Sequence, residues 1–449
     1  MTNQIVTLNV TQTVAPAPAT LQQTGALISQ GATTQSAGSW TILTQASDLT
    51  PLLTGGKAIT SATWATGTVT VTTTAPHGFT LADTLPLTVS GVTVSGSVAN
   101  GYNGTFTATV TGASTFTYAV ASNPGTAVTT SAIYTPEDVA ELVEQVTTFF
   151  GVGSSASIYV LELGAGNATD GVTALSAWIT ANPAVFYLYV VPRYWDANSA
   201  FLAFLATFES VTAKTYFLVT TTTGTYTSYT ALMKDVLALV EAPAVAAADA
   251  VLPVEFSIAA VAYVILNRNP SGVSKVPPLA FSFLPGTTPY PLKGNSALLA
   301  ALKAAGINYV GTGAEGYISN AILFWGTTAD KKQFNYWYAA DWAQINLDLD
   351  LSNAIINGSN NNLAPLSYNQ QGINALQAVA QATLNRGIEY GLLLAPATVT
   401  AVPFATYVKN NPSDYANGVY NGLAATITPQ NGFTSITFNL NVTNFPLGS

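Results

Sequence analysis

Residues 185–221 read VFYLYVVPRYWDANSAFLAFLATFESVTAKTYFLVTT, and this stretch decides the fold class of the chain. Its two ends, 185–191 and 215–221, are apolar runs rich in β-branched and aromatic residues, which is typical of buried strands. Between them, apolar residues around 201–208 recur at helical spacing. A strand, a helix and a second strand in this order predict a unit of two parallel strands joined by a crossover helix.

The alternation of strands and helices continues on both sides of this unit. Thr135-Pro136-Glu137-Asp138 begins a helix, because Thr caps it, Pro takes the first position and acids fill the first turn. Further strands are predicted at 158–163 and 307–310, and further helices around 175–179 and at 229–241, 296–305 and 370–387. The sequence therefore predicts a mixed α/β fold with a largely parallel sheet.

A hairpin is predicted between the last two of these helices. YISNAILFW (317–325) and FNYWYAADW (334–342) both alternate, and the turn GTTADKK (326–332) lies between them. The aromatic residues of this region are Phe334, Tyr336, Trp337, Tyr338 and Trp342. No basic residues are interleaved with them, so we expect a packing or interface cluster and not a base-stacking platform.

Residues 59–133 differ from the rest of the chain in composition and in the pattern of apolar residues. They are rich in Thr, Val and Gly, and short alternating runs such as ATGTVTVTTT and GTFTATVTG are separated by turn signals. No helical period is present in this stretch. The pattern predicts a small antiparallel sandwich or barrel, an all-β domain inserted into the α/β chain.

Both ends of the chain contain alternating segments that lie beyond structure-breaking residues. At the N-terminus the breaker is APAPAT (15–20), and at the C-terminus PQNG (429–432) precedes FTSITFNLNVTNF (433–445). The apolar residues of the two segments are Ile5, Leu8, Val10, Ile436, Phe438, Leu440 and Val442. A lone strand is not stable in water, so each segment must join a sheet, either in its own chain or in another copy.

The length of 449 residues allows about two to four domains. The predicted segments are an N-terminal arm (1–20), the first part of a core domain (21–58), the inserted all-β domain (59–133), an α/β middle domain (134–295), a C-terminal core domain (296–428) and a C-terminal arm (429–449).

The chain carries few charges. Only 7% of its residues are Asp, Glu, Lys or Arg, where about a quarter is usual. A surface with so few charges has little repulsion and tends to associate. This favours a subunit that buries its surface against copies of itself; the alternative is an acid-adapted or secreted monomer.

Composition also argues against several classes of partner and site. The 12 basic residues form no cluster and the net charge is −9, which argues against nucleic-acid binding. The chain has no cysteine, which excludes thiolate metal sites, thiol catalysis and disulfides. Residues 1–16 lack the basic and apolar regions of a signal peptide. The longest apolar stretch, 256–266, is too short to span a bilayer, so no membrane association is expected.

Three patterns resemble chemical sites, and each has a structural interpretation that we prefer. GTGAEG (311–316), with Asp330 downstream, is a formal dinucleotide motif, but strand-like residues follow it where a helix is required. Asp348 and Asp350 resemble a metal-binding Asp-x-Asp, but no second acidic cluster accompanies them. His77 is the only histidine, and it cannot build a triad or a multi-histidine metal site.

The acids of the helix that starts at Thr135 are expected to form a solvated or interfacial face. They are Glu137, Asp138, Glu141 and Glu144. No set of residues supplies a nucleophile, a base and an oxyanion donor. The sequence therefore predicts no catalytic, cofactor or metal site and no enzyme activity.

The layout as a whole resembles the contractile tail sheath proteins of bacteriophages with myovirus-type tails. The matching features are an N-terminal arm, Gly25-Ala26-Leu27-Ile28, an α/β middle, the helix–Ala305-Gly306-Ile307-Asn308–strand unit, a hairpin leading into an amphipathic helix, a late long helix and a C-terminal strand. The inserted domain resembles β modules of phage tail proteins at His77-Gly78-Phe79, Ser90-Gly91, Tyr102-Asn103-Gly104-Thr105-Phe106 and Thr115-Phe116-Thr117-Tyr118. Sheath proteins often carry a basic pair where this chain has Asn335-Tyr336-Trp337-Tyr338, which puts a charged contact with the tail tube in doubt here.

The resemblance implies a virion protein that is assembled in the host bacterial cytoplasm and stacks as hexameric rings around a tail tube. The rings would contract and drive the tube through the host envelope. The implied partners are other copies of the chain, the tube protein, and the baseplate and tail terminator proteins, with no cofactor, nucleic acid or membrane. The two arms would exchange strands between neighbouring subunits through the seven apolar residues named above.

Three alternatives remain at this stage. A baseplate, tail fibre or receptor-binding protein would be β-rich throughout, whereas 135–310 alternates helix and strand. A nucleotide-binding enzyme would use 311–316 with Asp348 and Asp350. A secreted surface-layer protein or adhesin is weakened by the missing signal sequence.

Overall fold

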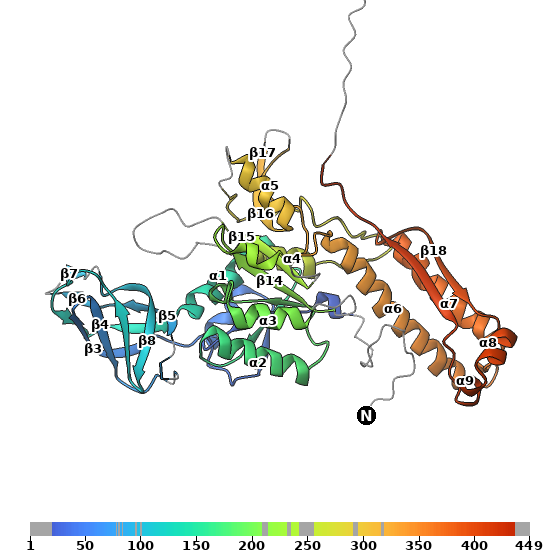
Figure 1. Ribbon diagram of the computed structural model, residues 1–449, viewed down its shortest axis with the longest axis horizontal. Coiled ribbons are helices and arrows are strands. Elements are labelled where there is room, and N and C mark those ends of the chain that lie inside the picture. Colours follow the sequence, from blue (N-terminus) through green and yellow to red (C-terminus); the bar gives the residue numbers. More distant parts are fainter. Residues whose placement is uncertain are drawn as a thin grey trace, which may run out of the picture.

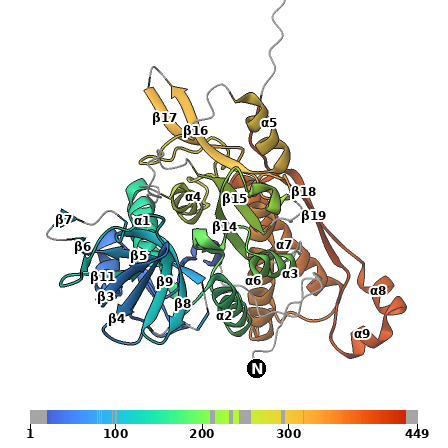
Figure 2. The same ribbon diagram turned by 60° about the vertical axis from the view of Figure 1, so that its left-hand side comes forward.

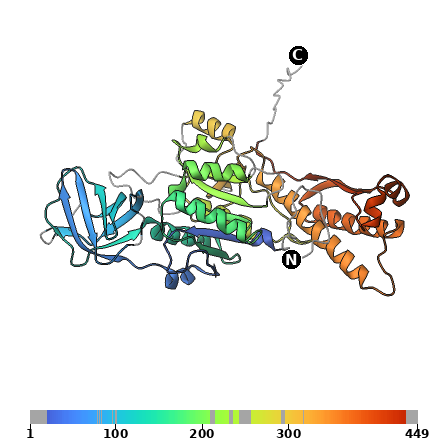
Figure 3. The ribbon, with the colours of Figure 1, turned by 60° about the horizontal axis from the view of Figure 1, so that its bottom comes forward.

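The computed structural model describes residues 20–77, 79, 81–82, 84–94, 97–98, 101–208, 214–230, 235–241, 256–290, 295–315 and 318–435. The seven predicted arm residues, Ile5, Leu8, Val10, Ile436, Phe438, Leu440 and Val442, lie outside these ranges. Three bodies follow one another along the long axis of the described part (Figures 1 and 3): a β barrel, an α/β body, and a pair of long helices with a two-stranded sheet.

An eight-stranded sheet forms the centre of the α/β body, in the order β17-β16-β15-β14-β13-β1-β12-β2. The strands are β1 (Gly25–Ser29), β2 (Trp40–Leu43), β12 (Ile158–Glu162), β13 (Leu188–Val190), β14 (Tyr216–Thr221), β15 (Val236–Val240), β16 (Asn308–Glu315) and β17 (Ile318–Phe324). Only β2 and β17, at the two edges, pair in antiparallel fashion. The predicted α/β class with a largely parallel sheet is confirmed.

Helices cover both faces of this sheet. One face packs against α1 (Glu137–Val152) and α4 (Ser257–Leu266), and the other against α2 (Ala168–Ala181), α3 (Ser199–Thr207) and α5 (Ser296–Ala305). Successive strand residues point to opposite faces, so both layers draw on the same apolar runs. The apolar stretch at 256–266 is α4, which the sheet and α1 bury. Among the described helices, none has both the length and the apolarity that crossing a membrane requires.

The predicted helix at 229–241 is wrong. A short 3-10 helix, Tyr226–Tyr229, precedes β15, and all five residues of β15 are buried. Ala, Leu, Met and Lys in this stretch favour a helix by propensity. A place between two parallel strands, covered on both faces, overrides that preference.

The predicted strand at 334–342 is also wrong, because these residues begin the long helix α6 (Phe334–Ser359). Phe334, Trp337, Tyr338 and Trp342 lie three, four and eight positions apart on one helix face, and all four are buried. Tyr336 lies between them, so aromatic residues also occur at every second position (334, 336 and 338), and the same letters read as an alternating strand. The strand β17 pairs with β16 instead.

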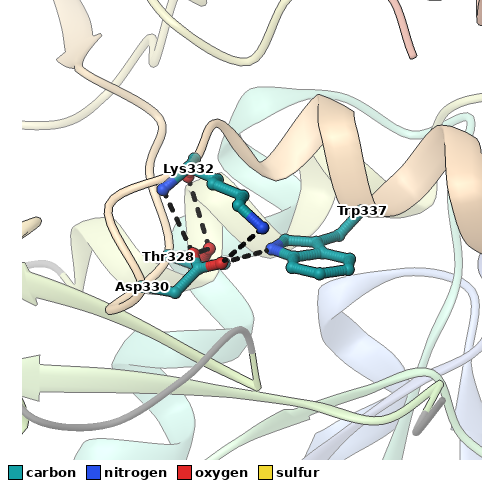
Figure 4. A network of polar contacts seen from close by, with 4 residues as sticks. All are labelled: Thr328, Asp330, Lys332 and Trp337. Atoms are coloured by element: carbon teal, nitrogen blue, oxygen red, sulfur yellow. Dashed lines mark hydrogen bonds and ion pairs between the residues drawn. The ribbon is translucent and has the colours of Figure 1, made fainter. Parts of the chain in front are cut away.

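A network of polar contacts fixes the turn before α6 (Figure 4). Oδ1 of Asp330 accepts hydrogen bonds from Oγ1 of Thr328 (2.6 Å) and from the backbone N–H of Lys332 (3.1 Å). Oδ2 accepts from Nε1 of Trp337 at 2.9 Å, and Nζ of Lys332 lies 4.4 Å from the centre of the Trp337 ring. One carboxylate therefore joins the turn to the first turn of the helix.

The inserted all-β domain is a closed barrel in the order β11-β3-β4-β9-β8-β5. Its strands are β3 (Lys57–Ala65), β4 (Thr68–Thr73), β5 (Thr84–Ser90), β8 (Gly104–Gly112), β9 (Thr115–Ala119) and β11 (Ile133–Pro136). A small sheet of β6 (Thr93–Val94), β7 (Ser97–Val98) and β10 (Ala127–Val128) lies beside it. Phe116 and Tyr134 are fully buried in the barrel, which has an apolar core of its own. The predicted β insertion is confirmed.

The third body contains α6, α7 (Gln370–Glu389) and a hairpin of β18 (Leu393–Ala401) and β19 (Leu423–Pro429). Two short helices, α8 (Phe404–Asn410) and α9 (Pro412–Ala416), lie in the connection between the strands. Figure 2 shows this body and the barrel on different sides of the α/β body. The helix predicted at 370–387 is confirmed as α7.

Candidate strand-docking site

The two-stranded sheet of β18 and β19 is the element of the described chain best suited to accept a further strand. In the described residues these two strands pair only with each other. The sheet lies at the end of the molecule remote from the barrel (Figure 1). Small sheets of this kind need additional strands or a covering layer to be stable.

The two faces of this sheet differ in chemistry. On the inner face, Ala397 and Val399 are buried, and Leu423 and Ile427 pack against the core formed with α6 and α7. The outer face is exposed and rich in threonine, with Thr398, Thr400, Thr426 and Thr428. A strand that extends the sheet in register would therefore need apolar residues on one side and polar residues on the other.

The hydrogen-bonding pattern shows which backbone groups point out of the sheet. The backbone N–H of Val402 donates to the carbonyl of Gly422 at 2.9 Å, and Thr398 is the partner of Thr426. Bonded pairs recur every second residue in an antiparallel ladder. Even-numbered residues of β19 therefore bond to β18, and the N–H and C=O groups of Leu423, Ala425 and Ile427 point to the outer edge.

The chain that leaves β19 is held by a side-chain amide. The backbone N–H of Gly432 donates to Oε1 of Gln333 at 2.8 Å, and Nε2 of Gln333 donates to the Gly432 carbonyl at 2.7 Å. A Cβ atom at residue 432 would lie 2.4 Å from Cβ of Pro278, so only glycine fits there. Because Gln333 immediately precedes α6, this contact fixes the point from which the predicted C-terminal arm departs.

The dinucleotide interpretation of GTGAEG is rejected for its described residues. Gly311 and Gly313 lie within the strand β16, and the next described residues form the paired strand β17. A Cβ at Gly311 would lie 2.4 Å from the Phe324 ring, so glycine here permits cross-strand packing. The N-terminal helix turn that would hold a pyrophosphate is replaced by this hairpin.

The two aspartates of α6 do not form a common site. Asp350 accepts a hydrogen bond from Oγ1 of Thr383 at 2.5 Å and forms an ion pair with Arg386, both on α7. Asp348 is only 9% exposed, and burial raises its pKa, an effect that the charge of Lys214 opposes. Residues two apart on a helix point in different directions. In the described ranges, no three His, Asp or Glu side chains gather as metal ligands.

His77 has the structural role that was expected. It is buried in the barrel, its Nδ1 accepts from the backbone N–H of Phe79 at 3.1 Å, and its ring stacks on the Phe79 ring. The expectation of an outward-facing acidic row is wrong for Glu141, which is 3% exposed. Its Oε1 accepts from the backbone N–H of Arg193 at 2.7 Å, because this face of α1 packs against the turn after β13.

A buried carboxylate that the sequence did not single out ties α6 to the central sheet. Oδ2 of Asp341 accepts hydrogen bonds from Oη of Tyr187 (2.9 Å) and Oη of Tyr216 (2.7 Å). Burial and the charge of Asp341 both raise the pKa of the two tyrosines. The signal was a single acid between Tyr338 and Trp342, which becomes visible only once this segment is recognised as a helix.

Comparison with known proteins gives a fold and no sequence relative. No protein-family model matches the chain, and no curated protein matches it. The helical sheath of the anti-feeding prophage in its contracted state matches with a TM-score of 0.55 and 12% identity, over 98% of this chain and 99% of that one. A sheath tail protein from Listeria innocua also matches, with a TM-score of 0.41 and 11% identity, over 87% of this chain and 89% of that one. The baseplate of the anti-feeding prophage in its contracted state matches with a TM-score of 0.40 and 13% identity, over 67% of this chain and 83% of that one. The chain has the fold of a contractile tail sheath protein.

Proposed function

We propose that this chain is a structural subunit of a contractile phage tail sheath and not an enzyme. The observation that carries the proposal is the likeness to the anti-feeding prophage sheath, which extends over nearly the full length of both chains. The scarcity of charge, 7% of residues, supports a protein that buries its surface in an assembly. The subunits would stack as hexameric rings around a tail tube and contract to drive the tube through the host envelope.

Strand exchange would link the subunits. The predicted arm segments alternate apolar and polar residues, and the β18–β19 sheet offers the same alternation on its inner and outer faces. Strand addition joins two molecules through main-chain hydrogen bonds. Contacts of this head-to-tail kind build open helical assemblies, which suits a sheath.

The work of contraction would come from two packings of the same subunits that differ in free energy. No nucleotide or metal is required by such a mechanism. Besides other copies of itself, the subunit would contact the tail tube, the baseplate and the tail terminator. It would be a component of the virion tail, assembled in the host bacterial cytoplasm.

Negative-stain electron microscopy of the purified chain tests this function. We expect tubes or stacked rings from the full chain. Deletion of 1–14 or of 433–449 should leave monomers whose circular dichroism spectrum and urea unfolding transition match those of the full chain. Substitution of Thr437 by Ser, which keeps the apolar side of the arm intact, is the matched control and should assemble. Tubes of unchanged number and length from both deletions would contradict the linkage by arms.

A further inference from the structure

Two glutamines of α7 cover the outer edge of β18. Nε2 of Gln381 donates to the Ala397 carbonyl at 2.8 Å, and Oε1 of Gln381 accepts from the Val399 N–H at 3.0 Å. Nε2 of Gln377 donates to the Val399 carbonyl, also at 2.8 Å. The amide of Gln381 thus makes the two bonds that a residue of a parallel neighbouring strand would make. These are the outward-pointing groups of β18, because Thr398 and Thr400 face β19.

Two other features make β18 a poor edge for strand addition. Its pairing with β19 is interrupted by an irregularity between Leu394 and Thr398. Pro396, which has no N–H to donate, lies within that interruption. Prolines and bulges are the devices by which proteins close the edges of sheets to further strands.

The edge of β19 has no such cover among the described residues. Its only proline, Pro429, is the last residue of the strand. Ala425 is exposed although it lies between Leu423 and Ile427 on the inner face, so the described residues leave this part of the inner face uncovered. An added strand with apolar residues on that side would bury Ala425 and extend the threonine-rich outer face with its polar residues.

We infer that Gln377 and Gln381 direct the strand exchange of the proposed function, in which a neighbouring copy supplies 436–443, to the edge of β19. The apolar residues of that segment, at every second position from Ile436 to Val442, match the inner face, and its Thr and Asn residues match the outer face. The segment comes from another copy because its own chain leaves β19 toward Gln333, where Gly432 is held by two hydrogen bonds. This inference rests on the proposed function, since it assigns the edge at which the subunits join.

Disulfide trapping tests the assignment, because the chain has no cysteine of its own. Thr398 and Thr426 are direct partners, both exposed on the outer face, and each belongs to the strand that forms a different edge of the sheet. One protein would carry Thr426→Cys or Thr398→Cys, and a second protein would carry Asn439→Cys or Asn441→Cys. The two would be mixed, assembled and oxidised, so that every mixed dimer reports a contact between two copies. Cross-strand neighbours lie within the reach of a disulfide.

We expect dimers with Thr426→Cys and at least roughly tenfold fewer with Thr398→Cys, because a strand on β18 must first displace three hydrogen bonds. Replacing Gln377 and Gln381 together by alanine, which keeps the helix propensity, should raise the Thr398→Cys dimers. Gln371→Ala, an exposed position on the same helix, is the control and should leave both yields unchanged.

Equal yields from the two cysteines in assembled tubes would overturn the edge assignment and leave the sheath function intact. An unchanged Thr398→Cys yield after the double substitution would show that the glutamines do not select the edge. The absence of both tubes and dimers would contradict the proposed function itself.

Discussion

At the scale of residues, side-chain amides and a few buried carboxylates link distant segments of this chain through hydrogen bonds. In more highly charged proteins, ion pairs often make such links. Gln22, Gln23 and Gln30 bond to the backbone carbonyls of Tyr338, Arg268 and Asn167, and Gln333 holds both backbone groups of Gly432. An amide has a donor and an acceptor, so it can replace a missing strand or turn without carrying charge into the core.

Glu162 is the most completely bonded of the buried carboxylates. Its Oε1 accepts from the backbone N–H groups of Gly31 and Gly164, both at 2.7 Å. Its Oε2 accepts from Oγ of Ser29 (2.6 Å) and from Oγ1 (2.7 Å) and N–H (3.2 Å) of Thr33. The carboxylate therefore holds the loop after β1 against the end of β12.

Replacing Glu162 by Gln should destabilise the α/β body. The NH₂ group of the glutamine would face donors whichever way the amide is turned, so at least one buried N–H or O–H would lose its acceptor. The expected loss is about 2–3 kcal/mol in the free energy of unfolding, measured by urea titration followed by intrinsic fluorescence. Glu389→Gln, at an exposed position, should show no change. Equal stability of the two variants would show that these hydrogen bonds contribute little.

Asp348→Asn should stabilise the protein at neutral pH. Burial raises the pKa of Asp348 in the folded state, so the folded protein binds this proton more tightly than the unfolded chain. The charged form therefore costs stability at pH values above the folded pKa, and this cost disappears below the unfolded pKa of about 4. The free energy of unfolding of the variant, measured with urea, should exceed that of the unsubstituted chain most at pH 7, and the difference should vanish near pH 3. Asp350→Asn, which removes the negative charge that pairs with Arg386, should instead destabilise at pH 7.

At the scale of elements, the sequence was most informative where an apolar run has one dominant period. The strands near 158–163, 185–191 and 215–221 and the helix at 370–387 were predicted at their observed places. The helix α6 was missed because its aromatic residues satisfy both a period of two and a helical period. The strand β15 was missed because its residues favour a helix locally, and only the neighbouring strands decide otherwise.

The docking sheet could be predicted only in part. Alternation at the chain ends indicated strands that need partners, and nothing in the sequence between 393 and 429 marked the sheet that could receive them. The edge of β18 is covered through contacts between residues 16 and 22 positions apart in the sequence, Gln381 with Ala397 and Gln377 with Val399. Such contacts follow from the packing of α7 and leave no local pattern.

The beginning of α6 depends on Asp330, which gives a test at this scale. Asp330→Ala removes the acceptor for Thr328, Lys332 and Trp337 together, and the indole N–H of Trp337 loses its partner. We expect a loss of about 1–3 kcal/mol in the free energy of unfolding and a change in near-ultraviolet circular dichroism from Trp337. Asp330→Asn keeps one acceptor oxygen, so its free energy of unfolding should lie between those of the unsubstituted chain and Asp330→Ala. An unchanged free energy of unfolding and an unchanged near-ultraviolet spectrum in Asp330→Ala would contradict the role of this network.

At the scale of the whole molecule, the barrel is attached to the α/β body through two adjacent strands. Lys57 of β3 pairs with Tyr134 of β11, so the chain enters and leaves the barrel at neighbouring points. The barrel core is separate from the two cores of the α/β body. The barrel and the β18–β19 sheet lie at opposite ends of the described molecule (Figure 1).

Removing the barrel should therefore leave assembly intact. Replacement of 59–133 by a short Gly-Ser linker should preserve the unfolding transition of the α/β body and the formation of tubes, because the linker spans only the gap between paired strands. The matching measurement is electron microscopy together with urea unfolding. Loss of the folded body would show that the barrel is part of its stability, and folded subunits without tubes would show that the barrel takes part in the lattice.

The central claim is that the ends of the chain complete sheets in other copies of the molecule. A cryo-electron microscopy map of the assembled chain tests it most directly, at a resolution that separates strands about 4.8 Å apart. We predict that 436–443 of one subunit lies along β19 of a neighbouring subunit, with Ile436, Phe438, Leu440 and Val442 on the inner face. A map in which both chain ends pair only within their own subunit would contradict the account.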